Sequence, residues 1–119
     1  MQAVFDRRGV TVGWIDDERV LDLRVQHRAF VRGSALFGYD TRYLGTFSGG
    51  FFRDRAGNAV AFIRGASGGP LLPLTQLPPI PPLAPLPPLK PLAPLAPLAP
   101  WPSLSWSKLS WEDFLSSQA

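Results

Sequence analysis

Small, apolar and polar positions repeat every sixteen residues over the first 69 residues of the chain. Each repeat contains a small residue, a mostly aromatic residue and an apolar residue, in the triplets Gly13-Trp14-Ile15, Ala29-Phe30-Val31, Gly45-Thr46-Phe47 and Ala61-Phe62-Ile63. Turn-forming pairs follow the triplets at Asp16-Asp17, Arg32-Gly33, Ser48-Gly49 and Arg64-Gly65. Sixteen residues accommodate two strands of about five residues and two turns. The pattern therefore predicts four β-hairpins and an all-β domain over residues 1–69.

Four equivalent hairpins can share a core if they surround a pseudo-fourfold axis. The small column would then lie where four backbones approach the axis, because only a residue with little or no side chain fits there. The period-two rule for strands places the third residue of each triplet on the same face as the small one. We expect Ile15, Val31, Phe47 and Ile63 to form an apolar layer there. The second column, Trp14, Phe30, Thr46 and Phe62, points to the opposite face.

These repeats resemble a family of bacterial proteins, the four-fold β-flower proteins, in which short hairpins form petals around a central axis. The stretches that carry the resemblance are GWIDDERVLDL, AFVRGSALFGYD, GTFSGGFFRD and AFIRGASGGPLLP. The resemblance covers roughly residues 4–73, and a proline-rich tail with tryptophans follows. The family has no established biochemical activity. The resemblance therefore implies a fold, and a fold does not by itself imply a function.

A second period, of three residues, begins at Pro70 and ends at Pro102, and all fourteen prolines lie within it. Proline occupies one register with the sole exception of Gln76, and a second register is entirely aliphatic. The third register contains mainly Ala and Pro, with one lysine, Lys90. A polyproline II helix has three residues per turn, so the pattern predicts a rod with a proline edge, a leucine edge and a mostly small edge.

The leucine edge raises the question of what covers it, because a line of exposed leucines marks an interaction surface. A straight rod of this length would extend about 100 Å, far beyond a 69-residue domain. The rod is therefore expected to wrap its own domain, to cross other copies of the chain, or to dock on a partner. Residues 85–90 also fit the PxxPx(+) pattern that SH3-like grooves bind. Disorder is the remaining alternative.

Residues 103–119 form a third segment rich in aromatic residues. Ser110 followed by Glu112 and Asp113 is typical of a helix N-terminus, which predicts a short helix with Trp111, Phe114 and Leu115 on one face. These aromatics either plug an open face of this flower or of a neighbouring one, or bind a partner. A membrane anchor is the poorest alternative, because Lys108 is the only basic residue here and two acids follow it. The candidate interaction residues of the rod and this segment are Leu83, Leu86, Leu89, Leu92, Leu95, Leu98, Trp101, Trp106, Trp111 and Phe114.

Charge and composition exclude several functions. The net charge of +3 comes from residues 1–69, where acidic residues are interleaved with arginines rather than segregated from them, and this distribution is not typical of nucleic-acid binding. The chain has no cysteine, so disulfides and thiolate chemistry are excluded. Because neither a signal peptide nor a transmembrane segment is evident, a cytoplasmic location is the default expectation. Export by another route stays open.

No catalytic or metal-binding pattern is present, and we expect neither enzymatic activity nor a cofactor. His27 is the only histidine, and turn chemistry accounts for the acidic cluster Asp16, Asp17 and Glu18. The sequence therefore favours a non-catalytic scaffold or interaction module that binds an unknown protein or further copies of itself. The alternative is a small-molecule or glycan site between hairpins, with Trp14, Phe30 and Phe62 as its aromatic faces.

Overall fold

The computed structural model describes residues 1–116, which form one closed eight-stranded antiparallel barrel and a terminal helix. The strands are β1 (Gln2–Asp6), β2 (Thr11–Asp16), β3 (Arg19–Asp22), β4 (His27–Arg32), β5 (Ala35–Gly38), β6 (Tyr43–Ser48), β7 (Phe51–Arg53) and β8 (Ala59–Phe62). The helix α1 spans Trp111–Ser116. Three hairpins, β2–β3, β4–β5 and β6–β7, follow the sixteen-residue repeat in order. The prediction of an all-β domain of four hairpins is confirmed.

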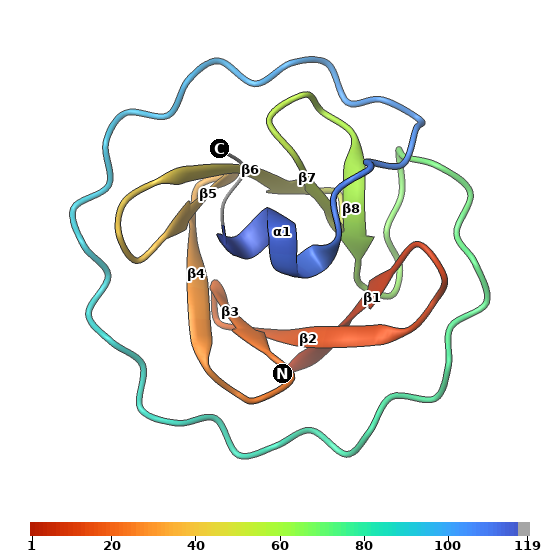
Figure 1. Cartoon of the computed structure of the whole chain (residues 1–119), viewed down its shortest axis with the longest axis horizontal. Helices are drawn as coiled ribbons and strands as arrows, with labels where there is room; N and C mark the ends of the chain where they lie inside the picture. The colour runs from red at the N-terminus through yellow and green to blue at the C-terminus, as the bar shows by residue number, and fades with distance from the viewer. Residues whose placement is uncertain (117–119) are drawn as a thin grey trace.

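The fourth hairpin is made from the two ends of the repeat region. Strand β8 pairs with β1, with Phe5 opposite Phe62 and Asp6 opposite Ala61, and this pairing closes the barrel (Figure 1). Closure removes the unpaired strand edges that would otherwise invite pairing with another chain. The chain thus begins with the second strand of a petal whose first strand arrives some sixty residues later.

Each petal bends at the same position of the repeat. The pairing register shifts at Val4/Phe5, Val20/Leu21, Leu36/Phe37 and Phe52/Arg53. A β-bulge bends a strand and increases its twist, and a small barrel needs such bends to close. The four bulges, sixteen residues apart, therefore give the pseudo-fourfold shape.

The column Val4, Val20, Leu36 and Phe52 fills the barrel interior together with Ala29 and Ala61. Val31 belongs to the same cluster, and the partly buried Ile15, Phe47 and Ile63 pack against it, as the sequence predicts. Trp111, Phe114 and Leu115 of α1 complete this cluster. Helix α1 therefore closes one end of the barrel, where Figure 1 shows it at the centre.

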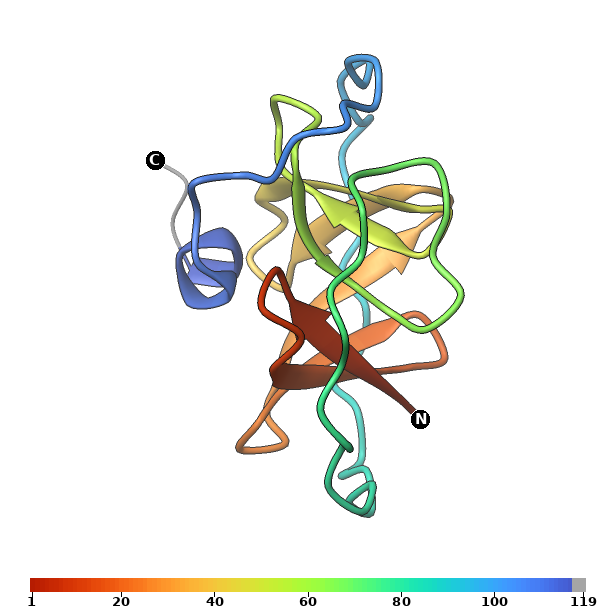
Figure 2. The same ribbon diagram turned by 90° about the vertical axis from the view of Figure 1, so that its right-hand side faces the viewer.

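Residues 70–102, which we call the belt, contain no helix or strand and encircle the barrel once (Figure 1). The molecule measures 37 × 35 × 22 Å. Viewed edge-on, the belt lies between the face that carries α1 and the opposite face, which carries the hairpin turns (Figure 2). Of the alternatives for the rod, the structure shows that it wraps its own domain. Its description as a regular polyproline II helix stays a prediction.

The belt wraps the barrel but leaves its leucine edge uncovered. The sequence had predicted wrapping because it would cover this edge. The partly buried belt residues belong to the proline and small-residue registers, whereas every member of the aliphatic register is exposed. Proline rings and small side chains let the belt backbone come within hydrogen-bonding distance of the petals. Inward-facing leucines would hold that backbone away, so the leucines face outward.

Candidate functional site

Hydrogen bonds fix the start of the belt to the linker between β1 and β2. The backbone N–H of Gln76 donates to Gly9 O at 2.9 Å, and its side-chain Oε1 accepts from Thr11 N at 2.9 Å. Gly9 has φ +80°, and a Cβ there would lie 2.0 Å from Leu74 O, so only glycine allows this approach. Gln76, the one exception in the proline register, thus supplies the donor that proline lacks.

We predict that Gln76→Pro, which would make the proline register uniform, lowers the free energy of unfolding by about 1–3 kcal/mol. Proline removes the donor to Gly9 O, and losing Oε1 leaves the Thr11 N–H without its acceptor. Urea unfolding measures the change. Pro79→Gln in the same register, where the side chain is exposed, is the control and should be near neutral. Equal stability of Gln76→Pro and wild type would contradict the prediction.

Petal β2–β3 and the start of β4 hold the middle of the belt. Arg19 Nη1 donates to Pro88 O at 2.8 Å, and His27 Nε2 lies 3.2 Å from Pro85 O. Lys90 Nζ pairs with Glu18 Oε1 at 3.3 Å. The residues that define the PxxPx(+) pattern therefore contact the chain's own petals, and an SH3-like groove would have to displace these contacts.

The buried Arg53 of β7 joins the two ends of the belt. Its Nη1 donates to Gly57 O at 2.7 Å and to Ser103 O at 2.8 Å, and its Nη2 donates to Gly68 O at 3.0 Å. The guanidinium also lies 5.2 Å from the centroid of the Phe51 ring. Burial lowers the pKa of Arg53, while the nearby Asp54 acts in the opposite direction. One side chain thus fastens the segment before the belt to the segment after it.

The role of Arg53 was not predicted from the sequence, although the repeat marks this position as unusual. The equivalent positions in the other repeats are Phe5, Leu21 and Phe37, all buried and apolar. A charged residue in an otherwise apolar column indicates a buried polar contact, because burying a guanidinium without partners would be costly. The next residue, Asp54, accepts a hydrogen bond from Ser107 Oγ at 2.5 Å, which ties down the chain beyond the belt.

The outward edge of the belt is a continuous aliphatic line, which we call the girdle. Its ten side chains are 90–99% exposed. They are Leu71, Leu74, Leu77, Ile80, Leu83, Leu86, Leu89, Leu92, Leu95 and Leu98. Six of the candidate interaction residues, from Leu83 to Leu98, belong to the girdle. Trp101, which is 92% exposed, follows directly after it.

The other candidate aromatics lie inside the molecule. Trp106 packs against Phe51 and Phe62 and forms a bridge with Ala59 of β8. Trp111 and Phe114 are buried in the barrel core. The structure thus separates the predicted set into exposed girdle residues with Trp101, and three aromatics that pack within their own chain.

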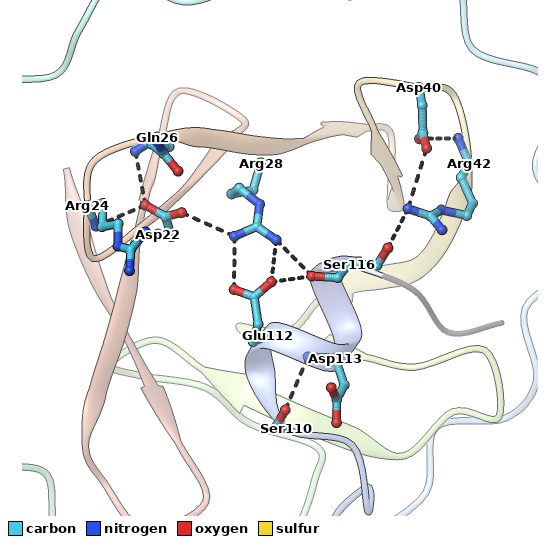
Figure 3. Close-up of polar contacts among 10 residues, drawn as sticks. All are labelled: Asp22, Arg24, Gln26, Arg28, Asp40, Arg42, Ser110, Glu112, Asp113 and Ser116. Atoms are coloured by element: carbon cyan, nitrogen blue, oxygen red, sulfur yellow. Dashed lines mark hydrogen bonds and ion pairs between the residues drawn. The ribbon is translucent and has the colours of Figure 1, made fainter.

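Polar contacts hold α1 on the barrel end (Figure 3). Ser110 Oγ accepts from Asp113 N at 3.1 Å, so the predicted N-cap is present. Arg28 of β4 donates to both carboxylate oxygens of Glu112, at 2.9 and 2.6 Å, and also pairs with Asp22. The bonds from Arg28, and then the Ser116 hydroxyl, lower the pKa of Glu112 to about 2.

We predict that this network gives wild type an acid sensitivity that Glu112→Gln lacks. Since the folded-state pKa is about 2 and the ordinary value is 4.5, the stabilisation is complete above pH 4.5 and is lost as the pH falls toward 2. Glu112 is 63% exposed, so solvent screening limits the effect to about 1 kcal/mol or less. Urea unfolding at pH 7 and pH 3 tests this, with Asp113→Asn as control. Parallel losses in wild type and Glu112→Gln would contradict it.

The aromatics of the alternative ligand site have three different surroundings. Phe30 packs against Phe37 and Tyr39, and the belt residue Ala93 packs against the cluster to which Phe30 belongs. Phe62 packs against Phe5 and Trp106. Trp14 borders a mostly apolar cavity of about 460 Å³, which lies between strands β1 and β2 and belt residues 77–81. The structure does not bring the three predicted rings together.

A larger cleft of about 840 Å³ runs beside α1, between the linkers at Asp6–Arg8 and Asp22–Arg24 and the segment at Ser107–Glu112. Among residues 1–116, no three His, Cys, Asp or Glu side chains are grouped so that they could hold a metal ion. In the same part of the chain, no helix has the length and apolar character needed to cross a membrane.

Relatives can be compared with this chain by three features of its fold. These are the eight strands in four equivalent hairpins, the belt, and the helix that closes the barrel. The family model of the 4-fold beta flower protein matches residues 2–115. The chain belongs to this family. The match takes in the belt and most of α1 as well as the barrel. Comparisons with curated proteins and with solved structures gave no match.

Proposed function

We propose that this β-flower protein is a non-catalytic interaction module whose girdle binds a protein surface. The observation that carries the proposal is the exposure of ten aliphatic side chains, one at every third residue, on an edge of the belt that the fold leaves uncovered. Burying one leucine is worth about 1.5–3 kcal/mol, which corresponds to about 60–120 Å² of apolar surface at ~25 cal/mol per Å². The whole girdle then exposes about 600–1,200 Å², which starts at the upper end of the ~300–600 Å² of the largest patch on a typical monomer.

The arrangement of the belt supports a binding role for this surface. The belt is fixed by Gln76, Arg19, Lys90 and Arg53 through backbone and charged contacts, none of which uses a girdle side chain. The leucines are therefore held in place without contributing to the attachment. A surface ordered before binding loses less conformational entropy when a partner arrives.

Affinity capture tests the proposal. Wild type and the variant Leu83→Ser/Leu86→Ser/Leu89→Ser/Leu92→Ser are immobilised and exposed to a lysate of the source cells. We expect wild type to retain specific proteins, or further copies of the chain itself, and the variant to lose them. Thermal unfolding should be unchanged, because each replaced side chain is at least 91% exposed. Identical capture by both proteins would refute a binding role of this arc.

The cavity beside Trp14 favours a second candidate function, binding of a small apolar molecule. Its lining includes Phe5, Ala3 and belt residues 77–81, with Arg64 as a charged group. Titration calorimetry with indole tests whether the cavity binds a small apolar molecule. Titration with methyl glycosides tests whether it binds a glycan. Ala3→Phe, which fills the cavity, should abolish the heat of binding. Absence of binding by wild type would leave the girdle as the sole candidate.

A further inference from the structure

The girdle differs in shape from an ordinary docking groove. It is convex, about one side chain wide, and follows the belt around the perimeter of a disc that is 22 Å thick (Figures 1 and 2). A straight helix or strand laid against a convex ring touches it over a short arc only. A partner that covers the girdle must therefore follow the curve or contact it at several separate points.

Both faces of the disc are polar. The face that carries α1 also carries the four linkers, which contain exposed arginines at 7, 8, 24, 42 and 55. The hairpin turns on the opposite face contain exposed Asp17, Glu18, Arg32 and Arg64. A lipid surface could cover the whole girdle only if it also covered one of these charged faces, and moving charged groups out of water is costly. The girdle is thus the long apolar line on the rim, whereas the faces carry only scattered exposed apolar side chains such as Leu23.

A second copy of the chain provides a matching surface. Girdle side chains recur every three residues, about 9 Å apart if the belt rises ~3.1 Å per residue. The space between two neighbouring leucines is then about as wide as one aliphatic side chain. The rim of another copy has the same spacing, so its leucines can fit into these spaces while the polar faces of both discs stay in water.

The size of such a contact determines the kind of assembly. Two convex rims meet over an arc of about three leucines each, which buries about 400–700 Å² in total. Stable dimers bury at least about 1,200 Å². One rim contact is therefore too small to hold a dimer, but the girdle extends around the perimeter and leaves room for several neighbours. Several weak contacts on one molecule reinforce one another.

We propose that copies of this chain associate edge to edge through their girdles, forming planar clusters that grow with concentration rather than a discrete dimer. This inference rests on the proposed function, since it names the partner of the same surface. It predicts a graded response to substitution. Removing the leucines of one arc weakens association, and removing all ten abolishes it, because no single arc is the binding site.

Sedimentation velocity on the full chain tests this from low micromolar to near-millimolar concentration, the range of weak protein contacts. The weight-average mass of wild type should rise roughly twofold or more. The four-serine variant should show a smaller rise, and a variant with all ten girdle residues replaced by serine should keep the mass of one chain. Leu23→Ser/Leu104→Ser, which alters exposed leucines outside the girdle, should behave as wild type. Sulfate should strengthen the association, because it favours apolar burial.

Three results would overturn the inference. The first is a wild-type mass of one chain at every concentration, and the second is association that the ten-serine variant retains. In the third, wild type remains monomeric but floats with phosphatidylcholine–phosphatidylglycerol vesicles and the ten-serine variant does not, which would assign the girdle to lipid. If wild type is monomeric yet captures another protein through the girdle, self-association fails and the proposed function stands. If it neither associates nor captures, both fail.

Discussion

Arg53→Met is expected to lower the free energy of unfolding by about 3–5 kcal/mol and to release the belt. The substitution keeps a similar apolar volume but leaves the carbonyls of Gly68 and Ser103 without the guanidinium donor. Gly57 O also loses Arg53 but keeps a hydrogen bond from the backbone N–H of Ser103, at 3.1 Å. Each unsatisfied buried group costs about 1–3 kcal/mol. Because Gly68 precedes the belt and Ser103 follows it, losing the guanidinium also removes this link between the belt's two ends.

Two measurements separate loss of stability from release of the belt. Urea unfolding reports the free energy, and limited proteolysis under native conditions reports cleavage within residues 70–102. Arg55→Met, which removes an exposed arginine two residues away, is the control and should change neither. Arg53→Lys keeps the charge but cannot reach all three carbonyls, so its effect should lie between wild type and Arg53→Met. Wild-type stability in Arg53→Met would show that the guanidinium does not join the ends.

Phe114→Ala is expected to cost a similar amount, about 3–5 kcal/mol. Phe114 is fully buried in the barrel core and lies 5.8 Å, between ring centroids, from Trp111. Truncation leaves a cavity at the end of the barrel, and the barrel strands cannot collapse into it because each is paired on both sides. Helix α1 has six residues, too few to be stable without this packing.

Leu98→Ala provides the matched comparison for Phe114→Ala. Leu98 is 99% exposed on the girdle, so its truncation should change the free energy of unfolding by less than about 0.5 kcal/mol. Urea unfolding of both variants, with the far-ultraviolet spectrum as a check of the barrel, gives the result. A small effect of Phe114→Ala would mean that α1 is an appendage rather than part of the core. A large effect of Leu98→Ala would mean that the girdle supports the fold.

Two of the positions where a repeat is interrupted help to attach the belt. Gln76 interrupts the proline register and bonds to Gly9 and Thr11. Arg53 interrupts an apolar column and bonds across the belt's ends. A regular repeat describes what equivalent units share, whereas an attachment occurs once and needs a side chain that the repeat lacks. The exceptions could therefore be found in the sequence, but their partners could not.

The sequence by itself determined the periodic parts of this protein. The sixteen-residue columns predicted the hairpins and the apolar layer, because each strand position faces one side of a pleated sheet. Ser110 with the acidic residues after it predicted the start of α1, because local capping decides where a short helix begins. The three-residue registers predicted that the leucines share one edge of the belt.

Only the tertiary structure decided how these parts meet. Strand β8 pairs with β1 because closing the ring satisfies two strand edges at once, and no local signal relates residues so far apart in the chain. A rod with three edges has no local preference for the edge that faces inward. The barrel selects the proline and small-residue edges, since these let the belt carbonyls and Gln76 reach hydrogen-bonding partners on the petals. That selection places the leucines outside, where they form the candidate binding surface.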